Sequence, residues 1–262
     1  PTLFPVHHKH GYGHARVLAV SGGRFQELVA LARSNPEAFR EVPREHCIAA
    51  AKDRLEFCRE SMRALQREGA SGEIVVARVT DLADEIVLGT LEFALAQTKR
   101  PEKTRGQFAL VALGGYGRRQ LNPYSDLDLC ILRPAFRREG IERTAAYLGP
   151  FLWDLGWENS LVQRTVRETI DLARADLRVF TGLLHARLLV GDERFFGDLR
   201  YRIRQFSTRE YPAEFSALAD LVSDEPASAK RAEIYAVEPN IKDGAGGLRH
   251  YHHALWLLSV YF

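Results

Sequence analysis

Two aspartates separated by a single leucine are the residues of this sequence whose types and spacing best suit a chemical role. Asp126 and Asp128 lie in DLDLCILR, whose alternating and then apolar residues predict a β-strand over residues 126–133. Side chains two residues apart on a strand leave the same face, and two such carboxylates repel each other unless a cation lies between them. Hard oxygen ligands suit Mg²⁺, which shares its coordination with water and substrate phosphates. The pair predicts a magnesium site; the alternative is a surface strand that ends in two solvated aspartates.

A glycine-rich stretch precedes the aspartates. In LGGYGRR, Gly114, Gly115 and Gly117 let the backbone pass close to a ligand, and amide groups at the start of a short helix can bind phosphate oxygens. Arg118 and Arg119 add positive charge, although a solvated helix face is the alternative for one of them. The stretch lacks the third glycine of a dinucleotide fingerprint and the Gly-Lys-Ser/Thr of a P-loop. Phosphate binding of another kind is therefore expected.

Length, composition and charge limit the class of protein. The chain has 262 residues, 46% of them hydrophobic, which is enough for a sizeable core in one large or two ordinary domains. A formal net charge of +2 gives no strong field that would attract nucleic acid or an anionic membrane. The longest apolar runs are shorter than the roughly 20 residues that a membrane helix needs, so the cytoplasm is the expected location. The three cysteines lack metal-ligand spacing and are expected to be reduced and buried.

The elements that must position the aspartates begin with a helical region. Apolar residues recur at helical spacing over residues 24–97, and the charged stretch 98–107 predicts a connection. Short apolar or alternating runs then predict three strands, at residues 108–113, 126–133 and 157–163.

Helices are expected between and after these strands. One is expected around residues 139–156, and Thr165 with Glu168 forms the pattern of a capping box that starts another. The spacing is helical again over residues 176–220, with an interruption near Gly191.

The combined pattern resembles a known superfamily. The motif consists of Gly-Gly, a spacer of ten residues and Asp-Leu-Asp on a predicted strand. It resembles the signature of the nucleotidyltransferases whose fold DNA polymerase beta shares. The longer segment LGGYGRRQLNPYSDLDLCIL resembles that of the bifunctional uridylyltransferase/uridylyl-removing enzymes, which modify the PII nitrogen-signalling protein. Two later segments, residues 164–196 and EPNIKDGAGGLRHYHHALW at 238–256, are similar to the same family. The resemblance covers residues 105–262, and the N-terminal helices match it only in character.

The resemblance implies a fold and a domain order. We expect an α/β (α+β) nucleotidyltransferase fold, in which a small mixed sheet is joined by a helical N-terminal arm and a C-terminal helical domain. The arm is expected at residues 1–100, the nucleotidyltransferase domain at 101–190 and the helical domain at 191–262. Because the chain starts without methionine and stops within a predicted helix, we expect a piece of a longer protein with the last domain truncated.

The resemblance also implies a reaction. In that family the nucleotidyltransferase domain transfers UMP from UTP to a tyrosine hydroxyl of PII and releases pyrophosphate. Asp126 and Asp128 would then hold two Mg²⁺ ions, one on the triphosphate and one at the incoming hydroxyl. Gly114 and Gly115 would cradle the triphosphate, and no cofactor beyond Mg²⁺ and the nucleotide is implied.

Four further residues are candidates for the site, and for two of them a purely structural explanation is also possible. Arg118 would offset developing charge. Ser125 would donate to a phosphate oxygen, or else forms a local turn. Glu158 is the only acid in the third predicted strand, where many superfamily members have a third carboxylate. Lys242 would reach a phosphate from its loop, or else is a solvent-exposed lysine.

Departures from the family pattern keep two other hypotheses open. Residues 160–162 read Ser-Leu-Val where the family shows Gly-His-Ser, while His185 and His250 replace a glutamate and an aspartate. One hypothesis is a nucleotidyltransferase with a different nucleotide or acceptor, such as adenylyl transfer. The other is a nucleotide-binding sensor without turnover.

Overall fold

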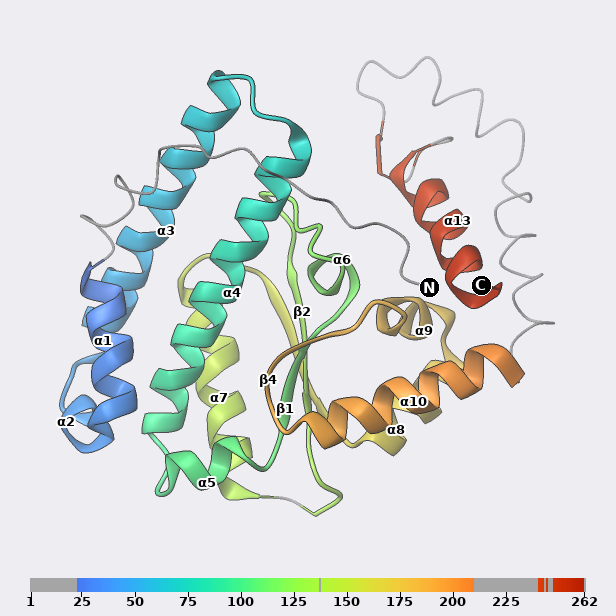
Figure 1. The fold of residues 1–262 in the computed structure, drawn as a ribbon. Helices are drawn as coiled ribbons and strands as arrows, with labels where there is room; N and C mark the ends of the chain where they lie inside the picture. Colours follow the sequence, from blue (N-terminus) through green and yellow to red (C-terminus); the bar gives the residue numbers. More distant parts are fainter. Residues whose placement is uncertain (1–22, 137, 210–239, 243, 245–246, 262) are drawn as a thin grey trace, which may run out of the picture. The chain divides into compact units, whose positions relative to one another are not determined.

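The structure is a computed structural model that describes residues 23–136, 138–209, 240–242, 244 and 247–261. The part of the predicted helical region beyond residue 209 lies outside these residues. The described residues form two compact units (Figure 1). Unit 1 takes the residues up to 104 together with 120–126 and 138–159, and unit 2 takes the rest.

Unit 1 is built from helices around one long central helix. Its helices are α1 (Gly23–Ser34), α2 (Pro36–Arg40), α3 (Arg44–Arg67), α4 (Gly72–Ala96) and α7 (Glu139–Asp154). Helix α4 packs against all four of the others, because its sequence is apolar on nearly every side. Near the C-terminal end of α4 the buried Phe93 ring meets Phe25 at 5.6 Å, Phe39 at 5.0 Å and Phe151 at 5.8 Å between ring centroids. Four helices therefore share one aromatic core.

Gly89 allows α1 to approach α4, which gives a first testable prediction. A Cβ at Gly89 would lie 2.5 Å from Phe25 Cζ and 2.9 Å from Val29 Cγ2. Alanine favours a helix by about 1 kcal/mol over glycine. Overpacking typically costs about 1–3 kcal/mol, and the Phe25 ring is too well packed to move aside. Gly89→Ala is expected to lower the free energy of unfolding, measured by urea titration. Gly72→Ala, in the same helix with nothing within 4 Å, is the control; equal stability of the two variants would contradict the prediction.

Unit 2 contains a four-stranded mixed sheet. Its strands are β1 (Ala109–Ala112), β2 (Leu127–Leu132), β3 (Asn159–Arg164, from its second residue) and β4 (Arg187–Gly191), in the order β3-β2-β1-β4. Strand β1 is antiparallel to both β2 and β4. Strands β2 and β3 run parallel, since Ser160 bonds Asp128 near one end and Arg133 N donates to Arg164 O (2.9 Å) at the other. Both inner strands are apolar and almost fully buried, except at Asp128 of β2, which is half-buried.

Helices complete the core of unit 2. They are α6 (Gly114–Gly117), α8 (Val166–Ala175), α9 (Leu177–Leu183), α10 (Glu193–Arg209) and α13 (Leu248–Tyr261). Apolar residues of β1 and β2 pack with those of α8, α9, α10 and α13 in a single cluster. This cluster includes Cys130, and burial raises the pKa of its thiol to about 12. Cys47 is also buried, Cys58 is half-buried, and all three are free.

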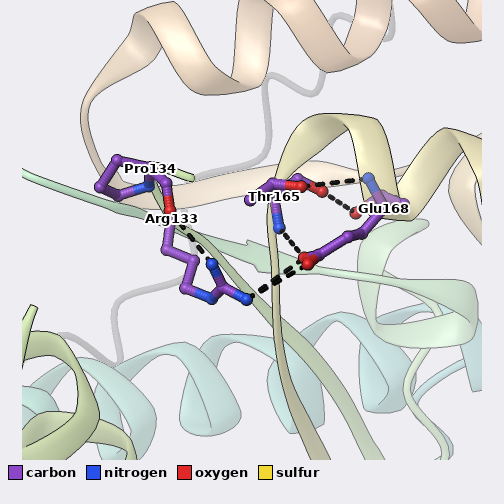
Figure 2. A network of polar contacts seen from close by, with 5 residues as sticks. Arg133, Pro134, Thr165 and Glu168 are labelled. Atoms are coloured by element: carbon purple, nitrogen blue, oxygen red, sulfur yellow. Dashed lines mark hydrogen bonds and ion pairs between the residues drawn. The ribbon is translucent and has the colours of Figure 1, made fainter. Parts of the chain in front are cut away.

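The predicted capping box at the start of α8 is confirmed (Figure 2). Glu168 N donates to Thr165 Oγ1 at 3.1 Å, and Thr165 N donates to a Glu168 carboxylate oxygen at 2.7 Å. Arg133, at the end of β2, reaches the same carboxylate at 3.3 Å. These contacts, led by the bond from the Thr165 amide, lower the pKa of Glu168. The end of β2 and the start of α8 are thereby tied together.

The predicted fold class is confirmed, with differences in individual elements. Residues 187–190, before the interruption near Gly191, were expected to be helical, which is wrong, because residues 187–191 form β4 by pairing with β1. The predicted connection contains a short helix, α5 (Pro101–Arg105). Strand β2 begins at Leu127, one residue later than predicted. No helix within the described part of the chain is long and apolar enough to cross a membrane.

Candidate active site

The pairing of β1 with β2 places the glycine turn beside Asp128. Ala112 is opposite Leu129, and Leu113 N donates to Asp128 O at 2.9 Å, so the chain leaves β1 next to that aspartate. Gly114 follows with φ +54°, a left-handed conformation that favours glycine. A Cβ there would lie 3.0 Å from Asp128 Oδ2. The first glycine is needed both for the turn and for the space that the carboxylate occupies.

Ser160 of β3 holds the other side of the same carboxylate. Its hydroxyl donates to Asp128 Oδ1 at 2.7 Å. Asp128 is half-buried, whereas Ser160 is exposed. Sequence reasoning noted Ser160 only as a departure from a family pattern, and no spacing signal along the chain connects residues 128 and 160. The contact depends on the pairing of β3 with β2.

Asp126 lies in the approach to β2. It is exposed and directly precedes the first residue of the strand. The residues before it form a turn in which Ser125 N donates to Asn122 O at 3.0 Å. Trp157 Nε1 donates to Ser125 O at 3.1 Å, within unit 1. The backbone leading into Asp126 is thus anchored by the Ser125 amide and carbonyl.

The rest of the glycine turn is packed against β4 and the loop before it. A Cβ on Gly117 would lie 2.5 Å from His185 O and 2.9 Å from Ala112 O, so only glycine fits there. Arg187 Nη2 donates to Tyr116 O at 3.3 Å, and its guanidinium lies 5.4 Å from the Tyr116 ring centroid. Gly115 is half-buried. Strand β4, absent from the sequence-based prediction, therefore supports the turn.

Arg118 ends α6 and points toward the C-terminal helix. Arg118 Nη2 donates to His252 Nε2 at 3.3 Å, and because a guanidinium has no acceptor, this contact needs a neutral imidazole. Burial is the main cause that lowers the pKa of Arg118. Burial, followed by the charges of Arg118, Arg249, His185 and His253, lowers the pKa of His252 to about 4. Helix α13 is thus joined to α6 through a histidine held in its neutral form.

Acidification is expected to loosen α13. Because the folded pKa of His252 lies below its ordinary value of 6.5, its contribution to stability is present above pH 6.5 and is lost as the pH falls toward 4. Amide hydrogen exchange in α13 should accelerate over this range. His252→Gln should reduce the pH dependence of the exchange rate in α13. The control His46→Gln, at an exposed position in α3, should leave that pH dependence unchanged. Identical pH profiles for His252→Gln and the unmodified protein would contradict the prediction.

Two candidates lie at exposed positions apart from these contacts. Glu158 is exposed, one residue before β3 and within unit 1. Lys242 is exposed in the loop before α13, where its amide donates to Asn240 Oδ1 at 3.0 Å and its carbonyl accepts from Arg249 N at 2.8 Å. The structure brings together Gly114, Asp128 and Ser160, with Gly117 and Arg118 at the far end of the same short helix.

The donor chemistry fits a hard divalent cation. No group of three or more His, Cys, Asp or Glu side chains suited to a metal is present in the residues that the structure describes. Mg²⁺ does not need such a group, because it commonly binds one or two carboxylates and takes its remaining ligands from water and substrate phosphates. Asp128, whose Oδ1 accepts from the Ser160 hydroxyl, is a carboxylate of this kind, and Asp126 is a second one two residues earlier in the sequence.

Comparisons with known proteins agree with the motifs. Residues 57–159 match the family model described as putative nucleotidyltransferase DUF294, and residues 217–262 match GlnD PII-uridylyltransferase. A bifunctional uridylyltransferase/uridylyl-removing enzyme of Caulobacter vibrioides (strain NA1000 / CB15N) is 35% identical over 209 residues, 79% of this chain and 21% of that protein. One of Phenylobacterium zucineum (strain HLK1) is 37% identical over 193 residues, 72% of this chain and 21% of the relative.

These relatives are much longer than the chain, which spans about a fifth of their length. The first matched segment contains the glycine turn and both aspartates, and the second contains α13. The resemblance drawn from the motifs is confirmed: the chain is similar to part of the bifunctional uridylyltransferase/uridylyl-removing enzymes and includes a segment that matches a nucleotidyltransferase family model.

Proposed function

We propose that this chain carries the nucleotidyltransferase centre of an enzyme that transfers UMP from UTP to a tyrosine hydroxyl of a PII-type protein. The attacking oxygen would form a bond to the α-phosphorus while the bond from that phosphorus to the bridging oxygen breaks, and pyrophosphate would leave. The observation that carries the proposal is Asp128, held beside the glycine turn within a segment that matches a nucleotidyltransferase model. The relatives' names support uridylyl transfer.

The residues of the chain have separate parts in this proposal. Asp126 and Asp128 would hold Mg²⁺, which when bound supplies positive charge to the triphosphate and favours ionisation of the incoming hydroxyl. The turn at Gly114 and Gly115 would bring backbone amides close to the triphosphate. Ser125 and Lys242 are candidates for further phosphate contacts. Arg118, the residue that follows α6, is half-buried and would offset charge that develops on the phosphates.

The hydroxyl proton needs an acceptor. Glu158 is our candidate, because it is an exposed carboxylate one residue before β3. A general base must come within hydrogen-bonding reach of the hydroxyl when the substrate binds. This role is part of the proposal.

Pyrophosphate release tests the proposal directly. The full-length protein is incubated with Mg²⁺ and, separately, UTP, ATP, CTP or GTP, with and without a PII-type protein. Release that needs both UTP and the PII-type protein, together with a mass increase of one UMP on its tyrosine, is the expected result. Pyrophosphate release with another nucleotide would show that UTP is not the substrate. Release that does not need the PII-type protein would show that the acceptor is a different molecule. Binding of nucleotide without release under any condition would contradict the enzymatic proposal.

A further inference from the structure

The hydroxyl of Ser160 is hydrogen-bonded to the carboxylate of Asp128. Ser160 Oγ is 2.7 Å from Asp128 Oδ1, the usual separation for a hydroxyl that donates to an oxygen acceptor. The direction of the bond is unambiguous, because an ionised carboxylate can only accept. Bonds of this kind to a charged acceptor are stronger than those between neutral groups.

The carboxylate is also constrained from a second side. Leu113 N fixes the Asp128 carbonyl through β-sheet pairing, and the backbone of Gly114 faces Asp128 Oδ2 so closely that a Cβ would lie 3.0 Å from it. The sheet sets where the side chain starts, the turn limits where one oxygen can go, and Ser160 fixes the other. All four residues belong to unit 2.

A carboxylate that accepts one hydroxyl bond can in general also ligate a cation. Two carboxylate oxygens provide about four lone-pair sites, of which the Ser160 hydroxyl uses one. Groups that hydrogen-bond to a ligating carboxylate set its orientation, and their loss typically weakens metal affinity or activity by about 10–100-fold. Ser160 is exposed, so it can be replaced with little effect on the core.

We propose that Ser160 is a positioning residue, whose hydroxyl orients the Asp128 carboxylate for a divalent cation. This inference rests on the proposed function, because it assumes that Asp128 is a metal ligand. Ser160 itself touches neither the metal nor the substrate in this role; it acts through Asp128. The threonine hydroxyl could make the same bond, whereas alanine could not.

Metal affinity separates this role from a merely structural one. The binding of Mn²⁺, used as a probe for Mg²⁺, is measured by electron paramagnetic resonance on the full-length protein and on Ser160→Ala, Ser160→Thr and Asp128→Asn. Ser160→Ala should bind Mn²⁺ about 10–100-fold more weakly, and Ser160→Thr should recover most of the affinity. In pyrophosphate release, Ser160→Ala should show a lower kcat at saturating Mg²⁺ with a similar KM for the nucleotide. Ser61→Ala, which removes a hydroxyl bond to Phe57 O in α3 of unit 1, should leave both unchanged.

The outcomes distinguish this inference from the proposed function. If Asp128→Asn loses Mn²⁺ binding and Ser160→Ala binds as the unmodified protein does, Ser160 has no positioning role while the metal site stands. If Ser160→Thr is as weak as Ser160→Ala, the hydroxyl is not what matters and the inference also fails. If Asp128→Asn binds Mn²⁺ as tightly as the unmodified protein, Asp128 is not a metal ligand, and both the proposed metal site and the role of Ser160 are contradicted.

Discussion

Replacing Asp128 with asparagine is expected to reduce nucleotidyl transfer by about a thousandfold or more. A metal ion contributes several kcal/mol of charge stabilisation in such reactions, and about 1.4 kcal/mol corresponds to a factor of ten. Asparagine has the same shape and can still accept from Ser160, but it lacks the negative charge. The rate is measured as UTP-dependent pyrophosphate release, with thermal unfolding to show that the variant is folded. Asp126→Asn should have an effect of similar size.

The control for this prediction removes a carboxylate from the same unit. Asp171 in α8 is exposed and pairs loosely with Arg167 at 3.7 Å. Surface pairs of this kind contribute little, so Asp171→Asn should keep both rate and stability. A folded Asp128→Asn protein that retains more than a tenth of the activity would show that the chemistry does not depend on this carboxylate.

Replacing Phe93 with alanine is expected to produce the largest loss of stability, about 3–5 kcal/mol in the free energy of unfolding. The ring is fully buried in α4 and meets aromatic rings from α1, α2 and α7. Alanine would leave a cavity that three rings and their helices cannot fill by small shifts. Urea unfolding followed by circular dichroism measures the change.

The matched control for Phe93→Ala is an aromatic residue of α7 on the surface. Trp153 has 54% of its surface exposed, and surface substitutions usually change stability by about 0.5 kcal/mol or less. The free energy of unfolding of Trp153→Ala should therefore be close to that of the unmodified protein. Similar losses for the two variants would mean that the aromatic cluster is not the centre of unit 1.

Local patterns could be predicted from the sequence where one stretch contains all the information. The Thr165–Glu168 capping box is such a case, because both partners lie within one helical turn. Strand β2 is another, since its alternating and apolar residues specify it within one residue. Gly114 and Gly117 were identified as candidates for phosphate binding, but the spacing could not show how tightly the backbone packs against them.

Features that depend on pairing between distant segments could not be predicted. The short run at residues 187–191 fits a helix or a strand by periodicity, and only its partner β1 makes it a strand. Ser160 reads as an ordinary polar residue until β3 lies beside β2. The contact of Arg118 with His252 spans 134 residues of sequence. In each case the sequence around one partner does not indicate the contact, because the other partner lies far away along the chain.

The order of chain segments in unit 1 has a consequence for synthesis. Helix α7, whose Phe151 covers Phe93 of α4, is made only after β1 and β2 of unit 2. The ribosome adds roughly 5–20 residues per second, so it needs about 3–12 seconds to proceed from the end of α4 to the end of α7. During that interval α1–α4 lack their last partner, and one aromatic face of α4 is open to water. The nascent chain is therefore most prone to aggregate before α7 emerges.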